Sequence, residues 1–267
     1  MTYLTTHPIW ITALLLLLPT TLFAMAGPIV VRRYVKLEKL RSNNEVAGFK
    51  FATVGVIYAV LLAFAIVIVW ERFDQAENDV AKEASAAATV LRLTQGLDEP
   101  HGAAVRAATL DYLKAAIARD WPAMAEGRPS HTVTVKLTAL YNTTLKFHTI
   151  DRAETLIVGD ILRNLDDLSD TRRKRLVLAD GIVPGIIWMV LFVGAFLTVA
   201  FTFFFGTANL RAQVAMSGAL AILIFSGLLT IVAIDHPFAG TVHVGPEAIA
   251  AVIEDFADVG GRDFGAK

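Results

Sequence analysis

Long apolar stretches alternate with polar stretches along the chain. The apolar stretches are Ile9–Val31, Phe51–Trp70, Ile182–Phe205 and Ala212–Ile234. Each reaches the length of about 20 residues that a helix needs to cross a bilayer, and none carries Asp, Glu, Lys or Arg in its interior. The first stretch follows no basic residue and is too long for the core of a secretory signal. The pattern therefore predicts an all-α, polytopic membrane protein with four transmembrane helices.

The spans and the polar stretches divide the chain into successive domains. We expect residues 1–70 to hold transmembrane helices 1 and 2 with a basic connector (32–50), residues 71–181 to form a helical extramembrane domain, residues 182–234 to hold transmembrane helices 3 and 4, and residues 235–267 to form a C-terminal tail. No glycine or proline interrupts Val67–Ala88, where apolar sequence becomes charged and alanine-rich. The second helix should thus continue from the bilayer into water, and the domain should be continuous with helices 2 and 3.

The polar domain shows helical periodicity broken by Gly and Pro clusters. The first predicted helix continues from the second span and ends near Leu97. Three more are predicted at about Ala103–Asp120, Thr132–Phe147 and Arg152–Leu168, and Ser169 is the predicted N-cap of a further helix. On the first of them, small and apolar residues recur at steps of three and four, at Phe73, Ala76, Val80, Ala84, Ala87 and Leu91. Such a narrow seam lets two helices approach closely. The partner is either a helix of the same chain or a helix of another copy around a symmetry axis.

Composition narrows the functional classes. Hydrophobic residues make up 55% of the chain and charged residues 18%, so the apolar excess belongs in lipid. The formal net charge of −1 gives no basic face for nucleic acid. The absence of cysteine excludes disulfides and thiol catalysis. Because no phosphate loop, nucleophile elbow or zinc signature occurs either, we expect no enzyme activity, no cofactor and no metal site.

Basic residues give conflicting indications of membrane orientation. The connector 32–50 carries six Lys and Arg residues against two Glu, whereas no Lys or Arg precedes the first span. The positive-inside rule then places this connector in the cytoplasm, and the termini and the 71–181 domain on the extracytoplasmic side. A basic cluster at Arg172–Arg175, directly before the third span, favours the opposite orientation.

Charged residues near the ends of the spans are the first candidate site. Trp70, Glu71 and Arg72 lie where the second span leaves lipid, and Arg172, Arg173 and Arg175 precede the third. One interpretation is a pore mouth, or an interface between copies, that these side chains shape. The other is an aromatic anchor, a snorkelling arginine, a solvated glutamate and a basic cluster that attracts anionic lipid headgroups.

The second candidate site follows the fourth span. Asp235, His236, Pro237 and Phe238 lie where the helix must stop, since proline cannot continue it. We expect a structural latch that holds the tail, and the alternative is a pH-responsive gate through His236.

The lack of charged side chains within the spans bears on the transport mechanism. Ion-coupled transporters and voltage sensors need charged side chains within the membrane. None of the four spans contains one, so a passive pore remains while an active pump is disfavoured.

Several motifs resemble those of a known family. They are "GFKFATVGVIYAVLLAFAIVIVWERFDQAENDVAKEASAAATVLRL", "LSDTRRKRL", "GAFLTVAFTFFFGTANLRAQ", "DHPFAG" and "VGPEA", in this order over nearly the whole chain. They resemble the bacterial "bestrophin-like" membrane protein family of unknown function. That label points to the bestrophins, pentameric anion channels with four membrane helices per subunit and a large helical region between the second and third. In bestrophins this region is cytoplasmic, opposite to the orientation that the connector indicates, and neither an aromatic neck nor an acidic calcium clasp can be placed on this sequence.

The resemblance implies a multi-pass protein of the bacterial inner membrane that assembles as a homo-oligomer and contacts lipid. It favours a passive, anion-leaning ion channel, with inorganic anions as the permeating partners. The alternative function is a non-conducting, membrane-anchored helical module that senses the envelope or binds a partner.

Overall fold

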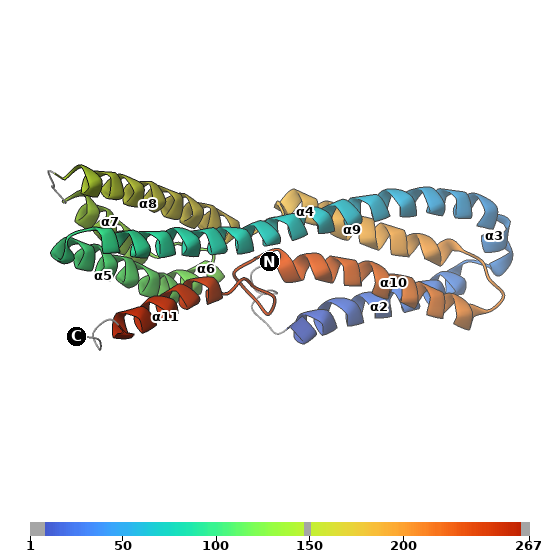
Figure 1. Cartoon of the computed structure of the whole chain (residues 1–267). Coiled ribbons are helices and arrows are strands. Elements are labelled where there is room, and N and C mark those ends of the chain that lie inside the picture. Colours follow the sequence, from blue (N-terminus) through green and yellow to red (C-terminus); the bar gives the residue numbers. More distant parts are fainter. Residues whose placement is uncertain (1–8, 147–150, 263–267) are drawn as a thin grey trace. The chain divides into compact units, whose positions relative to one another are not determined.

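The computed structural model describes residues 9–146 and 151–262, with side chains as far as residue 257. All regular elements in these ranges are helices (Figure 1). Contacts divide the chain into two compact units. The first, called here the membrane unit, comprises Met1–Glu71, Ile182–Asp235 and Gly240–Val242, and the second, the helical unit, comprises Arg72–Gly181, His236–Ala239 and His243–Lys267.

The membrane unit contains four helices that are long and apolar enough to cross a bilayer. Its elements are α2 (Ile9–Tyr34), α3 (Leu37–Ser42), the first part of α4 (Asn44–Leu93), α9 (Gly185–Phe201) with the 3₁₀ turn η3 (Thr202–Phe204), and α10 (Leu210–Ile234). Helices α2 and α10 run antiparallel along each other, and aromatic edges from Phe23, Phe196 and Phe225 join α2, α9 and α10. The predicted all-α membrane architecture is confirmed.

Helix α4 is one uninterrupted helix of 50 residues, as the sequence predicts. The transition from membrane to polar sequence therefore occurs within a single helix. Because the helix is continuous, its regular repeat fixes the directions in which the side chains of α4 point relative to one another.

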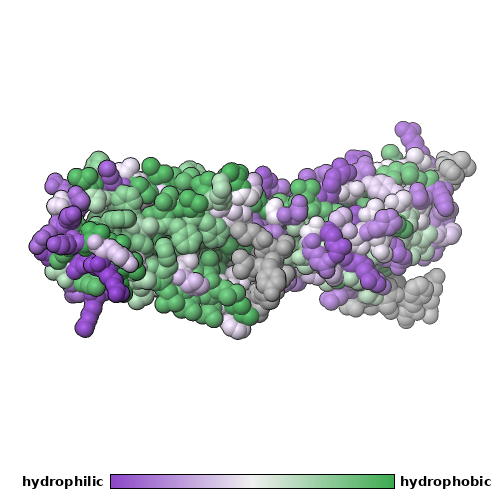
Figure 2. All heavy atoms as spheres, turned by 180° about the vertical axis from the view of Figure 1, so that it is seen from behind, coloured by the Kyte–Doolittle hydropathy of each residue, from purple (hydrophilic) through white to green (hydrophobic). Residues whose placement is uncertain are grey.

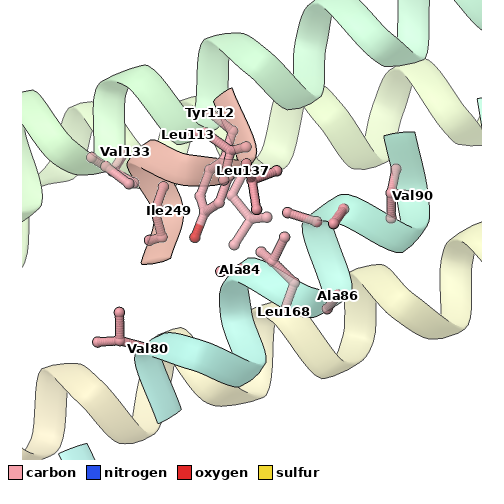
Figure 3. Close-up of a cluster of buried hydrophobic side chains, with 14 of the residues drawn as sticks. Val80, Ala84, Ala86, Val90, Tyr112, Leu113, Val133, Leu137, Leu168 and Ile249 are labelled. Carbon is pink, nitrogen blue, oxygen red and sulfur yellow. The ribbon is translucent and has the colours of Figure 1, made fainter. Parts of the chain in front are cut away.

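The helical unit is built from the second part of α4 and six further segments. These are η1 (Thr94–Gly96), α5 (Glu99–Ala115) with the π-helical turn η2 (Ala116–Asp120), α6 (Trp121–Ala125), α7 (His131–Leu145), α8 (Arg152–Leu178) and α11 (Glu247–Arg262). Figure 3 shows the core, where side chains of α4 meet Tyr112 and Leu113 of α5, Leu137 of α7 and Leu168 of α8.

The predicted seam on α4 closes within the chain. Ala76, Val80, Ala84, Ala87 and Leu91 are all at most 4% exposed and belong to the core of the helical unit. Small residues here let the helices of the same unit pack close to α4. The seam is therefore not available to a second copy.

Two local expectations differ from the structure. Ser169 does not start a helix, because α8 is continuous from Arg152 to Leu178. The N-cap of α8 is Asp151, whose Oδ1 accepts from the Ala153 amide at 2.8 Å. The tail contains α11, which we did not predict although Ile249, Val252 and Ile253 follow helical spacing after Pro246. The predicted end of the third polar helix, at Phe147, lies outside the described residues.

Candidate functional site

The membrane part of α4 is, together with α2, the least buried of the four apolar helices. Only Tyr58, Ala65 and Val69 of the stretch Phe51–Trp70 are buried by the rest of the chain. In its most apolar window α4 is 17% buried, against 50% for α10. Figure 2 shows how widely apolar residues cover the surface of the membrane unit. Most of the membrane part of α4 must therefore contact lipid or other copies of the chain.

The exposed residues of this stretch include one apolar face along α4. Val56, Val60, Phe64 and Val67 follow each other at steps of three and four, and each is between 48% and 64% exposed. On a helix these residues form a single stripe, opposite the buried residue Tyr58. A repeated copy of this stripe around an axis would make a narrow apolar passage.

The candidate mouth residues on α4 are exposed. Trp70, Glu71 and Arg72 have no buried side chain among them, and Trp70 is 62% exposed. The guanidinium of Arg72 donates to the Gln75 side-chain oxygen at 2.8 Å, one turn further along the helix. Arg72 is thereby held along α4, and its positive charge is not cancelled by this neutral partner.

The candidate arginines of α8 separate into two faces. Arg173 is exposed, whereas Arg172 and Arg175 are 6% and 0% exposed. Residues three apart share a helix face and adjacent residues do not, so the run "RRKR" cannot act as one cluster. Its outward neighbour Lys174 pairs with Asp170 at 2.7 Å on the surface.

The two inward arginines form a buried charge cluster with two carboxylates. Arg172 contacts both oxygens of Asp120, with Nε at 2.8 Å from Oδ2 and Nη2 at 3.1 Å from Oδ1. Arg175 makes the same forked contact with Glu83 of α4, at 2.8 Å and 3.1 Å, and its Nη2 lies 3.3 Å from Asp120 Oδ2. Two positive and two negative charges balance, which is the condition for burying them.

Neutral side chains complete this cluster. The Tyr112 hydroxyl donates to Glu83 Oε1 at 2.6 Å, and the Arg175 guanidinium lies 4.4 Å from the centre of the Trp121 ring. Burial, and then the Glu83 carboxylate, raise the pKa of Tyr112, so its hydroxyl stays a donor. Burial lowers the pKa of Arg175, but Glu83 and Tyr112 outweigh it and hold the pKa above its usual value. The cluster therefore joins α4, α5 and α8 in fixed register.

Asp120 owes its position to a feature that sequence reasoning missed. It is the last residue of the π-helical turn, and Pro122, which has no amide hydrogen to donate, follows it by two residues. A π turn adds one residue to a helical turn and so changes which side chain points inward. The dipeptide Trp121–Pro122 was the only signal of this turn in the sequence.

One further buried carboxylate lies outside these pairs. Asp79, one turn before Glu83 on α4, is 2% exposed, and in the described part of the chain its Oδ2 has no hydrogen-bond partner. Burial raises the pKa of Asp79, while Lys174 and Lys82 act in the opposite sense. Ionised Asp79 is therefore a destabilising charge in the folded helical unit.

The residues after α10 are fixed by local contacts. Asp235 Oδ1 accepts from the amides of Ile182 and Val183 at 3.2 Å and 2.8 Å, which ties the end of α10 to the turn before α9. Within the helical unit, Pro237 accepts through its carbonyl from the Val244 amide at 2.7 Å, and the Phe238 ring meets the Trp121 ring edge-on.

His236 lies against Gly181. A Cβ at Gly181 would come 3.0 Å from His236 Nε2, and φ of Gly181 is +97°, a conformation that favours glycine. All four candidate latch residues are buried, and the exposed fraction of Asp235, His236 and Phe238 is 8% or less. Both the predicted latch and the pH-responsive alternative stay predictions.

Among the described residues, no group of three or more His, Asp or Glu side chains is placed to hold a metal ion. Of the buried carboxylates, Glu83 and Asp120 pair with arginines, and Asp235 accepts from two backbone amides. The described residues thus present an internal charge balance and a large exposed apolar helix face.

Comparison with known proteins decides the family. A model of the bestrophin-like domain matches residues 18–249, which is most of the chain. The chain belongs to the bestrophin-like family. A search of curated protein sequences gave no match.

The bestrophin-like fold is also found among solved structures. A crystal structure of a point mutant of a bacterial bestrophin homologue from Klebsiella pneumoniae matches with a TM-score of 0.67 and 18% identity, covering 91% of this chain and 98% of that one. A second crystal structure of the Klebsiella pneumoniae homologue matches with a TM-score of 0.69 and 16% identity, over 91% and 98% of the two chains. At these identities the likeness establishes a shared fold.

Proposed function

We propose that this bestrophin-like protein is a passive ion channel formed by several copies of the chain, with the membrane part of α4 lining the path. The observation that carries the proposal is that the chain buries only 17% of the most apolar window of α4, the same share as for α2 and far less than the half that it buries for α10. A helix that its own chain does not cover is suited to line an axis shared by several copies. Family membership supports the same reading, since bestrophins are channels and not enzymes.

The apolar stripe Val56, Val60, Phe64 and Val67 would form the narrow part of the path. Apolar constrictions control ion flow by excluding water when they narrow. The spans carry no charged side chain in their interiors that could couple ion movement to a proton or another ion. The proposed conduction is therefore downhill and uncoupled.

The proposed mouth is smaller than the candidate set from the sequence. Arg172 and Arg175 are paired with carboxylates inside the helical unit and have no free charge to attract an anion. Any preference for inorganic anions then depends on exposed cations. Of these, Arg72 follows the last residue of the apolar stripe, Val67, by five residues along α4, and Arg173 lies on the surface of α8. Trp70 and Glu71 are proposed to anchor and shape the same mouth.

The placement in the bacterial inner membrane is part of the proposal. The basic connector favours a cytoplasmic position for itself and an extracytoplasmic one for the helical unit. The chain has no cysteine, so a single Ala123→Cys substitution reports which side is accessible to an impermeant thiol reagent. Labelling of intact cells supports the extracytoplasmic side, and labelling only after permeabilisation reverses it.

A non-conducting membrane-anchored module is the second candidate. The closed core of the helical unit favours it, because a self-contained helical domain could serve a partner without any ion path. An oligomer with an occluded axis that conducts nothing would support this alternative.

Halide flux from liposomes tests the proposal. Purified protein should release halide faster than empty liposomes, and Arg72→Ala should change the rate. Arg163→Ala is the matched control, since Arg163 is also exposed on a helix, where it pairs with Asp160 one turn away. Flux that is absent, or equally altered by both substitutions, contradicts the proposed mouth.

A further inference from the structure

A groove opens on the membrane unit beside the start of α4. It has a volume of about 490 Å³ and lies between the residues around the N-terminus of α4 and the end of α9 with η3. Its walls are mostly apolar, and its polar residues are Asn43 and Lys50; the other lining residues are Val46, Ala47, Leu197, Ala200, Phe201 and Phe204. Val46, Leu197 and Phe204 are each more than half exposed, so the chain itself does not fill the groove.

The end of the unit that holds this groove is rigidly built. Asn44 exchanges two hydrogen bonds with the backbone of Gly206, at 2.9 Å and 2.8 Å. A Cβ at Gly206 would lie 2.6 Å from the Arg41 backbone nitrogen, so only glycine allows this close approach. Arg32 of α2 donates to the Thr207 carbonyl, which joins a third segment to the same turn. The groove is therefore preformed.

The surroundings of the groove are strongly basic. The exposed cations of the connector 32–50 are Arg33, Lys36, Lys39, Arg41 and Lys50, against the carboxylates of Glu38 and Glu45. In Figure 2, hydrophilic residues gather at the end of the membrane unit, next to its broad apolar surface. Among these cations, Lys50 lines the groove itself. An occupant with an apolar body and an anionic head would match both features.

The chemistry of the groove favours a lipid over a helix of a second copy. An extended hydrocarbon chain is much narrower than a helix, which is about 10 Å across with its side chains. Of these two occupants, the lipid also brings the anionic head that matches Lys50. Basic residues at the membrane end of grooves between helices are a known means of holding anionic headgroups.

We propose that this groove binds an anionic phospholipid, with one acyl chain against Leu197, Ala200 and Phe204 and the phosphate beside Lys50. The bound lipid would cover the side of α4 that faces α9. It would thereby support α4 in a unit where the chain buries little of that helix. The proposal does not depend on ion conduction, and its test needs none.

Lipid retention by the purified protein tests this site. Detergent-solubilised protein is titrated with phosphatidylglycerol or with phosphatidylcholine of the same acyl chains, and bound lipid is counted by native mass spectrometry. We expect a preference for phosphatidylglycerol, which Lys50→Gln weakens about five-fold, the usual contribution of one basic residue near a membrane surface. Lys36→Gln removes an equal charge from the same end outside the groove lining and should leave the preference intact.

A second variant separates the groove from its charge. Ala200→Trp fills the groove and should lower retention of both lipids, while the thermal transition of the protein shows whether the variant is folded. Equal losses from Lys50→Gln and Lys36→Gln would indicate diffuse attraction and overturn the site, as would an absence of any preference. A Phe204→Cys protein that forms disulfide-linked dimers in the membrane would show that a second copy covers the groove, which also overturns the proposal.

Discussion

The Arg175→Met substitution tests whether the buried charge cluster holds the helical unit together. Arg175 is fully buried and makes the forked contact with Glu83 while also lying 3.3 Å from Asp120. Methionine keeps much of the apolar volume but leaves Glu83 with Tyr112 as its remaining hydrogen-bond donor in the cluster. Removing one partner of a buried pair costs about 3–5 kcal/mol, because the other charge stays buried without compensation.

This cost should be visible in thermal unfolding. For a chain of this size, about 2–4 °C of melting temperature corresponds to each kcal/mol, so we expect a decrease of roughly 6–20 °C. The assay is tryptophan fluorescence of the detergent-solubilised protein at one fixed scan rate, because membrane proteins often unfold irreversibly. Trp121, which stacks on Arg175, reports directly on the cluster.

A double variant shows whether the stranded charge is the cause. Glu83→Gln removes the uncompensated carboxylate, so Glu83→Gln with Arg175→Met should be more stable than Arg175→Met alone. A loss below about 1 kcal/mol, the size of an ordinary exposed ion pair, would refute the reasoning, as would a double variant no more stable than the single one.

Three further substitutions probe other contacts. Burial raises the pKa of Asp79, so the stability of the wild type falls as the pH rises from the ordinary carboxyl pKa through the raised pKa. The Asp79→Asn protein should therefore melt at the same temperature as the wild type at low pH and at a higher temperature near neutral pH. A difference in melting temperature that does not depend on pH would contradict this. Gly206→Ala should lower the melting temperature, because its Cβ would meet the backbone of Arg41, and an unchanged transition would show that the turn yields. Asp235→Ala leaves the amides of Ile182 and Val183 without their acceptor and should cost about 1–3 kcal/mol, measured by the same melting assay against Asp180→Ala as an exposed control.

The sequence predicts the helices better than it predicts their partners. Apolar runs and breaker residues suffice for the four spans and for the continuity of α4, since both depend on local pattern. The choice between an intrachain seam and a seam between copies depended on contacts distant in sequence, and Ala84 and Leu91 turn out to face the core of their own unit.

The candidate site was less predictable for a related reason. The spacing of Arg172 and Arg175 indicates a shared face, but only the fold shows that this face points toward Asp120 and Glu83, which lie 52 and 92 residues away in the sequence. The π turn that aims Asp120 inward has no simple sequence rule. The composition of "RRKR" suggests a single exposed cluster, but the geometry of the helix places its residues on two different faces.

Single-channel recording of a cysteine variant tests the central claim most directly. The chain has no cysteine of its own, so Phe64→Cys places one thiol on the exposed stripe of α4, and Leu191→Cys places one at a buried position of α9 as the control. In planar bilayers we expect discrete current steps that a charged thiol reagent blocks in Phe64→Cys and leaves unchanged in Leu191→Cys. Bilayers that contain the inserted protein but show no current steps in any salt, or a current indifferent to modification of Phe64→Cys, would contradict a channel lined by α4.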